Sequence, residues 1–203
     1  MNIRRILSVF LSAALCLSLL AGCGGAASSG SGSTSGTADG PQRYSTVFYD
    51  AFDTVTQVIA YCDSEEDFNA QMTALHADLL EYHKLYDIYN DYDGIVNVKT
   101  INDNAGKAPV TVDDKIWGML ELAQQMYDTT GGKLNIAMGS VLNIWHNYRE
   151  AALADDDDSN NQLPTQEELT SAAQHCGIEN LVIDDDAKTV YLADPEMSVS
   201  YTH

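Results

Sequence analysis

Residues 64–88, SEEDFNAQMTALHADLLEYHKLYDI, carry the clearest structural pattern in the sequence. Their apolar side chains recur at steps of three and four, which places them on one face of a helix. These side chains are Phe68, Met72, Leu75, Leu79, Tyr82 and Tyr86. Ser64 with Asp67 forms a weak capping box at the start. The pattern predicts a helix over about residues 64–88 that packs one face against the rest of the protein.

The segments on either side of this helix predict strands, a loop and a second helix. Residues 44–61 are rich in Val, Thr, Phe and Tyr, and predict two strands or one bent strand. Residues 91–109 predict a loop because turn-forming residues interrupt them. These are Gly94, Asn102, Asn104, Gly106 and Pro109. Thr111 with Asp114 predicts the start of a second helix, and Gly131 predicts its end.

The C-terminal third predicts one more helix and a hairpin. Thr165 with Glu168 is a stronger capping box, so a third helix is expected to run to about Cys176 and to stop at Gly177. Residues 181–184 and 189–192 are short apolar runs on either side of a turn, and they predict a β-hairpin. Helices and strands mix without strict βαβ alternation. The expected fold class is therefore α+β.

Composition narrows the functional classes. The 203 residues contain 30 Asp and Glu against 10 Lys and Arg, and 45% of them are hydrophobic. This hydrophobic content is enough for one ordinary hydrophobic core or for two very small ones. A formal charge of −20 argues against nucleic-acid binding and against electrostatic adhesion to anionic lipid, because both need a concentrated basic surface.

The N-terminus predicts export and a lipid anchor. Arg4 and Arg5 precede an apolar run over residues 6–20, which is short for a membrane span. Residues 20–23, LAGC, resemble the bacterial lipobox, in which the signal peptide is removed and the cysteine is lipidated. The alternatives are an ordinary signal peptide with an incidental cysteine, or an uncleaved anchor. We expect a protein anchored to the cell membrane through Cys23, on its extracytoplasmic side.

Three regions follow from this interpretation. Residues 1–22 are expected to be the signal peptide. Residues 23–43 are the lipidated cysteine and a Gly/Ser tether, which spans roughly 20–25 Å on average. Residues 44–203 are the folded body. Within the body, Cys62 and Cys176 are the remaining cysteines, and their pairing as a disulfide is left open.

Candidate chemistry is sparse when each residue is considered alone. The sequence has no P-loop and no other common catalytic motif. His76 and His83 are expected to be surface or packing residues, and the acidic run 155–158 a solvated insertion. Tyr89 and Tyr92 follow the first helix and could offer a ring for a planar ligand.

The segment 130–146, TGGKLNIAMGSVLNIWH, has two interpretations. Its glycines and amides suit a loop whose backbone approaches a ligand closely. The alternative is a helix end followed by another amphipathic helix. Composition does not decide between these two.

Four short motifs follow one another along the body. They are residues 52–54 (FDT), 88–90 (IYN), 97–106 (NVKTINDNAG) and 130–145 (TGGKLNIAMGSVLNIW). Their order resembles that of the ApbE family, the FAD:protein FMN transferases. The resemblance covers residues 44–197. It implies an incomplete ApbE-like, T-fold-like body that binds FAD and a divalent metal, usually Mg²⁺. It also implies transfer of FMN to a Thr hydroxyl of a membrane or exported partner protein, with release of AMP.

The resemblance also implies site residues. Phe52 stands where the family places an apolar FAD contact, and Tyr89 at the aromatic residue near the flavin nucleotide. Lys133, Leu134 and Asn135 stand in an FAD-binding stretch that usually resembles G-x-F-D-P. Leu134 and Asn135 depart from that pattern, and Asn135 keeps an acceptor oxygen but loses the charge. We expect Tyr89 and residues 133–135 to meet, with Phe52 lining the same cleft.

The end of the sequence departs further from the family. A D-x-G-G-I-A-K-G-like segment, a His-containing flavin motif and a metal motif are expected after the hairpin, but residues 197–203 read MSVSYTH. We therefore expect the N-terminal part of a longer transferase, inactive alone, with its catalytic residues unknown and its metal ligands in no residue present. The alternative is a non-catalytic surface lipoprotein that binds a flavin or a partner.

Overall fold

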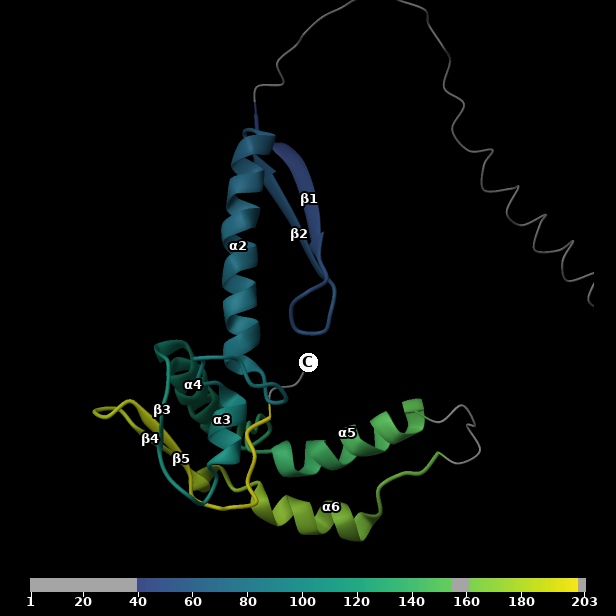
Figure 1. The fold of residues 1–203 in the computed structure, drawn as a ribbon, viewed down its shortest axis with the longest axis vertical. Coiled ribbons are helices and arrows are strands. Elements are labelled where there is room, and N and C mark those ends of the chain that lie inside the picture. The colour runs from purple at the N-terminus through teal and green to yellow at the C-terminus, as the bar shows by residue number, and fades with distance from the viewer. Residues whose placement is uncertain (1–39, 155–160, 201–203) are drawn as a thin grey trace, which may run out of the picture. The chain divides into compact units, whose positions relative to one another are not determined.

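The computed structural model describes residues 40–154 and 161–200 (Figure 1). The predicted signal peptide, the lipidation site Cys23, nearly all of the tether and the acidic run 155–158 lie outside these residues. In the described part of the chain, no helix combines the length and the apolar character needed to cross a bilayer. Helices and strands are mixed, and the fold is α+β, as the sequence predicts.

A β-hairpin packs along the longest helix. β1 (Gln42–Phe48) and β2 (Thr56–Cys62) pair antiparallel, which confirms the two-strand alternative, and α2 (Glu65–Tyr86) confirms the predicted helix. The Ser64 hydroxyl accepts the Asp67 N–H and caps α2. The inner hairpin face and α2 enclose a small cluster around Cys62, Phe68 and Met72. Figure 1 shows the hairpin beside the N-terminal half of α2.

The predicted loop over residues 91–109 is partly wrong, because it contains a short helix. α3 (Val98–Asp103) begins at Asn97, whose side chain forms a reciprocal capping box with Thr100. Val98 and Ile101 point into the core and are fully buried. Burial and the cap therefore outweigh the turn preference of the Asn residues that follow.

The second predicted helix is present as α4 (Asp114–Thr130), but its cap differs from the prediction. Asp113, not Thr111, caps the helix by accepting the Lys115 N–H. Thr111 instead belongs to β3 (Val110–Thr111) and pairs with Thr189. The helix ends as predicted at Gly131, which adopts a left-handed conformation with φ of 62°.

The main core lies where α3 and α4 meet a three-stranded sheet. β4 (Leu181–Asp184) and β5 (Thr189–Leu192) form the predicted hairpin, and β3 pairs with the other edge of β5. The largest side chains buried in this core come from both helices, the sheet and the C-terminal segment. They are Ile101, Ile116, Leu120, Leu192, Val98, Val190 and Val199.

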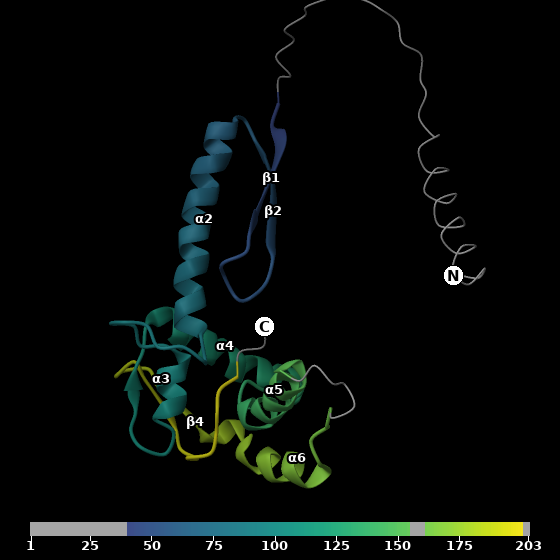
Figure 2. The same cartoon turned by 45° about the vertical axis from the view of Figure 1, so that its right-hand side comes forward.

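Two further helices carry the remaining segments. α5 (Gly139–Ala154) shows that the stretch 130–146 continues as a helix after its glycines. α6 (Gln166–Ala172) has the predicted capping box, and 3₁₀ turns at Ala173–His175 and Ile178–Asn180 lead to β4. Figures 1 and 2 show α5 and α6 side by side. Cys62 and Cys176 are both free thiols.

Close contact between α5 and the C-terminal segment depends on a glycine. The Gly139 N–H donates to the Ser198 carbonyl over 3.0 Å. A Cβ at Gly139 would collide with that same carbonyl group. Glycine at this position therefore lets residues 194–200 lie against the start of α5.

Candidate functional site

The carboxylate of Asp87 organises the loop that follows α2. Asp87 is buried, and its two oxygens accept hydrogen bonds from the Tyr89 N–H (2.6 Å), the Asn90 side chain (2.9 Å) and the Tyr92 hydroxyl (2.7 Å). Burial alone would raise the pKa of Asp87, but these bonds outweigh it and lower the pKa. The ionised carboxylate therefore fixes the backbone that presents Tyr89.

His83 connects this loop to the tip of the β-hairpin. The Phe52 N–H donates to Nδ1 of His83 over 3.1 Å, and Nε2 of His83 lies 3.4 Å from the Tyr92 hydroxyl. A backbone N–H can only donate, so Nδ1 must be an acceptor and the ring proton sits on Nε2. Burial and the bond to Asp87 raise the pKa of Tyr92 to about 12, so its hydroxyl stays protonated as a donor.

The hairpin tip adopts an uncommon backbone conformation. Phe52 and Asp53 have φ of 60° and 50°, in the left-handed region. That conformation costs a non-glycine residue about 1–2 kcal/mol. The His83 bond and the edge-on contact of the Phe52 ring with His83 hold the tip in place. Strained backbone of this kind is concentrated at functional sites in proteins.

Tyr89 lies at the mouth of a polar cavity of about 420 Å³. Its ring is 40% exposed and stacks on His146 of α5. Amide, carboxylate and hydroxyl groups dominate the rest of the lining. The lining residues are Ile88, Tyr89, Asn102, Asp103, Asn143, His146, Asn147 and Ser198. Burial raises the pKa of Tyr89, while Arg149 opposes this rise. The cavity can therefore hold a planar ring with polar substituents.

Asn102 ties the C-terminal segment to this cavity. Its amide donates to the Val199 carbonyl over 3.0 Å, and its oxygen accepts the Val199 N–H over 2.8 Å. The paired bonds hold Ser198 in the cavity wall. Asn97 fixes the loop that carries Tyr89 by donating to the Asn90 carbonyl over 2.8 Å. Both asparagines therefore act through the backbone that they fix.

The structure brings Phe52 and Tyr89 into one hydrogen-bonded network. Residues 133–135 make their contacts elsewhere and do not line the described cavity beside Tyr89. The Leu134 N–H donates to the Thr130 hydroxyl over 3.1 Å, and the Asn135 amide donates to the Cys176 carbonyl over 2.9 Å. Lys133 lies between Gly132 and Leu134 in the chain. A flavin contact by Lys133, Leu134 or Asn135 stays a prediction.

Local sequence patterns did not predict that His146, Asn143, Asn147 and Ser198 line the cavity. His146 is 57 positions from Tyr89, and nothing local in the sequence indicates their contact. The only available signal was the order of the segments 88–90 and 130–145, which suggested that both approach one ligand.

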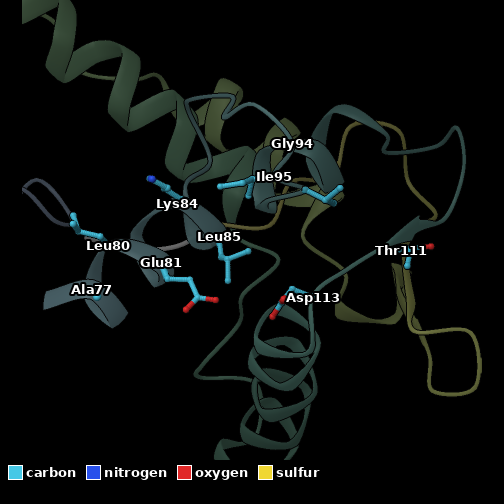
Figure 3. A pocket seen from close by; sticks show the side chains of 10 residues that line it. Ala77, Leu80, Glu81, Lys84, Leu85, Gly94, Ile95, Thr111 and Asp113 are labelled. Atoms are coloured by element: carbon cyan, nitrogen blue, oxygen red, sulfur yellow. The ribbon is translucent and has the colours of Figure 1, made fainter. Parts of the chain in front are cut away.

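A second cavity of about 690 Å³ lies between α2, residues 94–96 and the start of α4 (Figure 3). Figure 3 shows the side chains of Glu81 and Asp113 on opposite sides of the cavity. The side chains of Leu85 and Ile95 also line it. The Glu81 carboxylate is paired with Lys115 over 2.6 Å. No predicted site residue lines this cavity. Within the described residues, His, Cys, Asp and Glu side chains form no group of three that could hold a metal ion.

Comparison with known proteins identifies the family. Residues 52–201 match the family model described as the ApbE family. The chain belongs to the ApbE family. The matched region includes Phe52, Tyr89 and residues 133–135, as the resemblance at the sequence level predicts. No curated protein matches the chain.

Solved structures of ApbE proteins share this fold. The ApbE protein of Thermotoga maritima is 20% identical, with a TM-score of 0.60 over 78% of this chain and 47% of its own. The Pseudomonas stutzeri flavinyl transferase ApbE is 15% identical, with a TM-score of 0.59 over 79% and 47%. The Vibrio cholerae flavin transferase ApbE is 18% identical, with a TM-score of 0.60 over 78% and 48%. This chain spans about half the length of these ApbE structures.

Proposed function

We propose that this chain binds FAD in the cavity beside Tyr89 and serves in FAD:protein FMN transfer. The observation that carries the proposal is the position of the Tyr89 ring, fixed by Asp87 at the mouth of an amide-lined cavity in an ApbE-family chain. An aromatic face suits the flavin ring, and amide groups suit its carbonyl and ring-nitrogen edge.

In the proposed reaction, a Thr hydroxyl oxygen of an acceptor protein forms a new bond to the FMN phosphorus. The phosphoanhydride bond to AMP breaks, AMP leaves, and the hydroxyl proton is released. Positioning supplies much of the rate in such transfers. Within the described residues, Tyr89 and Asn143 would bind and orient the flavin part, and Asn102 would hold Ser198 in the cavity wall. Among the described residues no three His, Cys, Asp or Glu side chains form a metal-binding group, so Mg²⁺ is assigned no ligand here.

The proposal places the protein outside the cytoplasm, anchored to the membrane through Cys23. The charged N-terminus, the apolar run and the LAGC box support this placement, because they occur in the order and spacing of a lipoprotein signal. Radiolabelled fatty acid should enter the wild type and not the Cys23→Ala variant. Equal labelling of both would contradict the anchor.

Titration of FAD into the full chain, followed by flavin fluorescence, tests the binding site. Tyr89→Ala should weaken binding by about threefold to tenfold, the range of one aromatic stacking contact. Tyr61→Ala is a matched control, because Tyr61 is 69% exposed on the hairpin and belongs to no part of the proposed site. Equal loss in both variants, or no binding by the wild type, would contradict the proposal.

A second arm of the experiment separates transfer from binding alone. The full chain is incubated with FAD, Mg²⁺ and a Thr-bearing acceptor protein, and the acceptor is examined for covalent flavin fluorescence. Labelled acceptor together with released AMP would support a transferase. FAD binding without labelled acceptor is the result expected of a chain that is inactive alone.

A further inference from the structure

One face of the Tyr89 ring is covered by another ring of the protein, that of His146. The Tyr89 and His146 ring centroids are 4.9 Å apart, and their planes are inclined by only 27°. A third ring between them would need about 7 Å, since each stacked contact takes about 3.5 Å. The observed spacing therefore has no room for a ligand ring between Tyr89 and His146.

A hydrogen bond from the same helix holds His146 over Tyr89. Nη2 of Arg149 lies 3.1 Å from Nδ1 of His146, and the Tyr89 hydroxyl lies 3.4 Å from the same nitrogen. The guanidinium group can only donate, so Nδ1 keeps its lone pair in this arrangement. His146 and Arg149 are three positions apart and share one face of α5. Arg149 also contacts Glu150, over 3.2 Å, which orients the guanidinium group.

We propose that His146 is a gating residue for the Tyr89 site: it covers the ring when the cavity is empty and moves away when a flavin stacks there. This inference rests on the proposed function. His146 and Tyr89 both line the cavity. In this proposal the gate opens by rotation of the His146 side chain to another staggered rotamer. The covered state lowers the apparent affinity for FAD, because only the uncovered fraction can bind.

Replacement of His146 distinguishes a gate, which hinders FAD binding, from a residue that contributes to FAD binding. His146→Ala should bind FAD about 2- to 12-fold more tightly and associate faster, because the competing aromatic contact is gone. His146→Phe keeps a ring over Tyr89 and should stay within about twofold of the wild type. Arg149→Gln loosens the hold on His146 and should show a smaller gain than His146→Ala.

His76→Ala is the matched control. His76 also stacks on an aromatic ring, that of Phe48, with centroids 4.4 Å apart, and it lies on α2 in contact with the hairpin. Its loss should leave FAD affinity unchanged. Circular dichroism confirms that each variant is folded before the titration.

The outcomes separate this inference from the proposed function. Tighter binding by His146→Ala than by a wild type that itself binds FAD supports the gate. Equal or weaker binding by His146→Ala, while the wild type binds FAD, overturns the gate and leaves the proposed function intact. No binding by the wild type or by any variant overturns both.

Discussion

The hairpin arm, residues 42–76, and the main core differ in how much packing supports them. The buried cluster of the arm is built around Cys62, Phe68 and Met72. The main core unites thirteen buried residues from α2, α3, α4, the three-stranded sheet and the C-terminal segment. The candidate site lies where these two regions meet, because Phe52 comes from the arm and Asp87 from the end of α2. The geometry of the candidate site therefore depends more on contacts between the hairpin arm and the main core than on packing inside the arm.

The largest expected effect is in the main core. Leu120→Ala should lower the free energy of unfolding by about 2–5 kcal/mol, because Leu120 is fully buried on α4 and its loss leaves a cavity. Leu75→Ala, at a partly buried position in the arm, should cost about 1 kcal/mol. Urea unfolding followed by circular dichroism measures both. Equal losses would show that the arm is packed as strongly as the main core.

A smaller effect is expected where α5 meets the C-terminal segment. Gly139→Ala should lower the free energy of unfolding by about 1–3 kcal/mol, because the new methyl group collides with the Ser198 carbonyl. Gly118→Ala in α4 is the control. Nothing lies within 4 Å of the added methyl group, so the helix should gain up to about 1 kcal/mol. Thermal unfolding of the two variants should shift in opposite directions.

Loss of His83 should release the hairpin tip with little effect on the whole molecule. His83→Ala removes the acceptor of the Phe52 N–H, so hydrogen exchange at that amide should become faster. The free energy of unfolding should fall by only about 1 kcal/mol. His76→Ala removes a different contact with the hairpin, the hydrogen bond with Asp50, and should leave exchange at Phe52 unchanged. Unchanged exchange in His83→Ala would show that the tip is held by other contacts.

The smallest expected effect is the pH dependence of a surface pair. His175 contacts Asp194 over 2.8 Å, and that bond raises the pKa of His175. A raised pKa in the folded state stabilises the protein below the unfolded pKa of about 6.5, and the gain is lost as the pH rises through the folded value. The stability gap between the wild type and His175→Gln should therefore shrink from about pH 5.5 to about pH 8.5. Urea unfolding at both pH values measures it, and a gap that widens with pH would contradict the assignment.

Local patterns predicted the elements whose signals are contained in one segment. The 3–4 spacing predicted α2, and the Thr165–Glu168 box predicted the start of α6. The α3 helix was missed because the burial of Val98 and Ile101 depends on the distant sheet. Within the candidate site, Phe52 and Tyr89 were named from short motifs, whereas His146 and Ser198 were not. His146 contacts Tyr89, which lies 57 positions away in the chain. Ser198 is held in the cavity wall by the paired hydrogen bonds between Asn102 and Val199. No local sequence pattern records either contact.

The outer face of the hairpin has a consequence for handling the purified protein. Within the described residues β1 and β2 pair only with each other, so each strand leaves one edge open. The side chains of Ile59 and Tyr61 on β2 are 48% and 69% exposed. Open edges beside apolar side chains favour strand-to-strand aggregation. Repulsion between molecules that each carry a formal charge of −20 opposes this. Salt screens that repulsion over about 10 Å at 0.1 M, so colloidal stability should decline as the ionic strength rises.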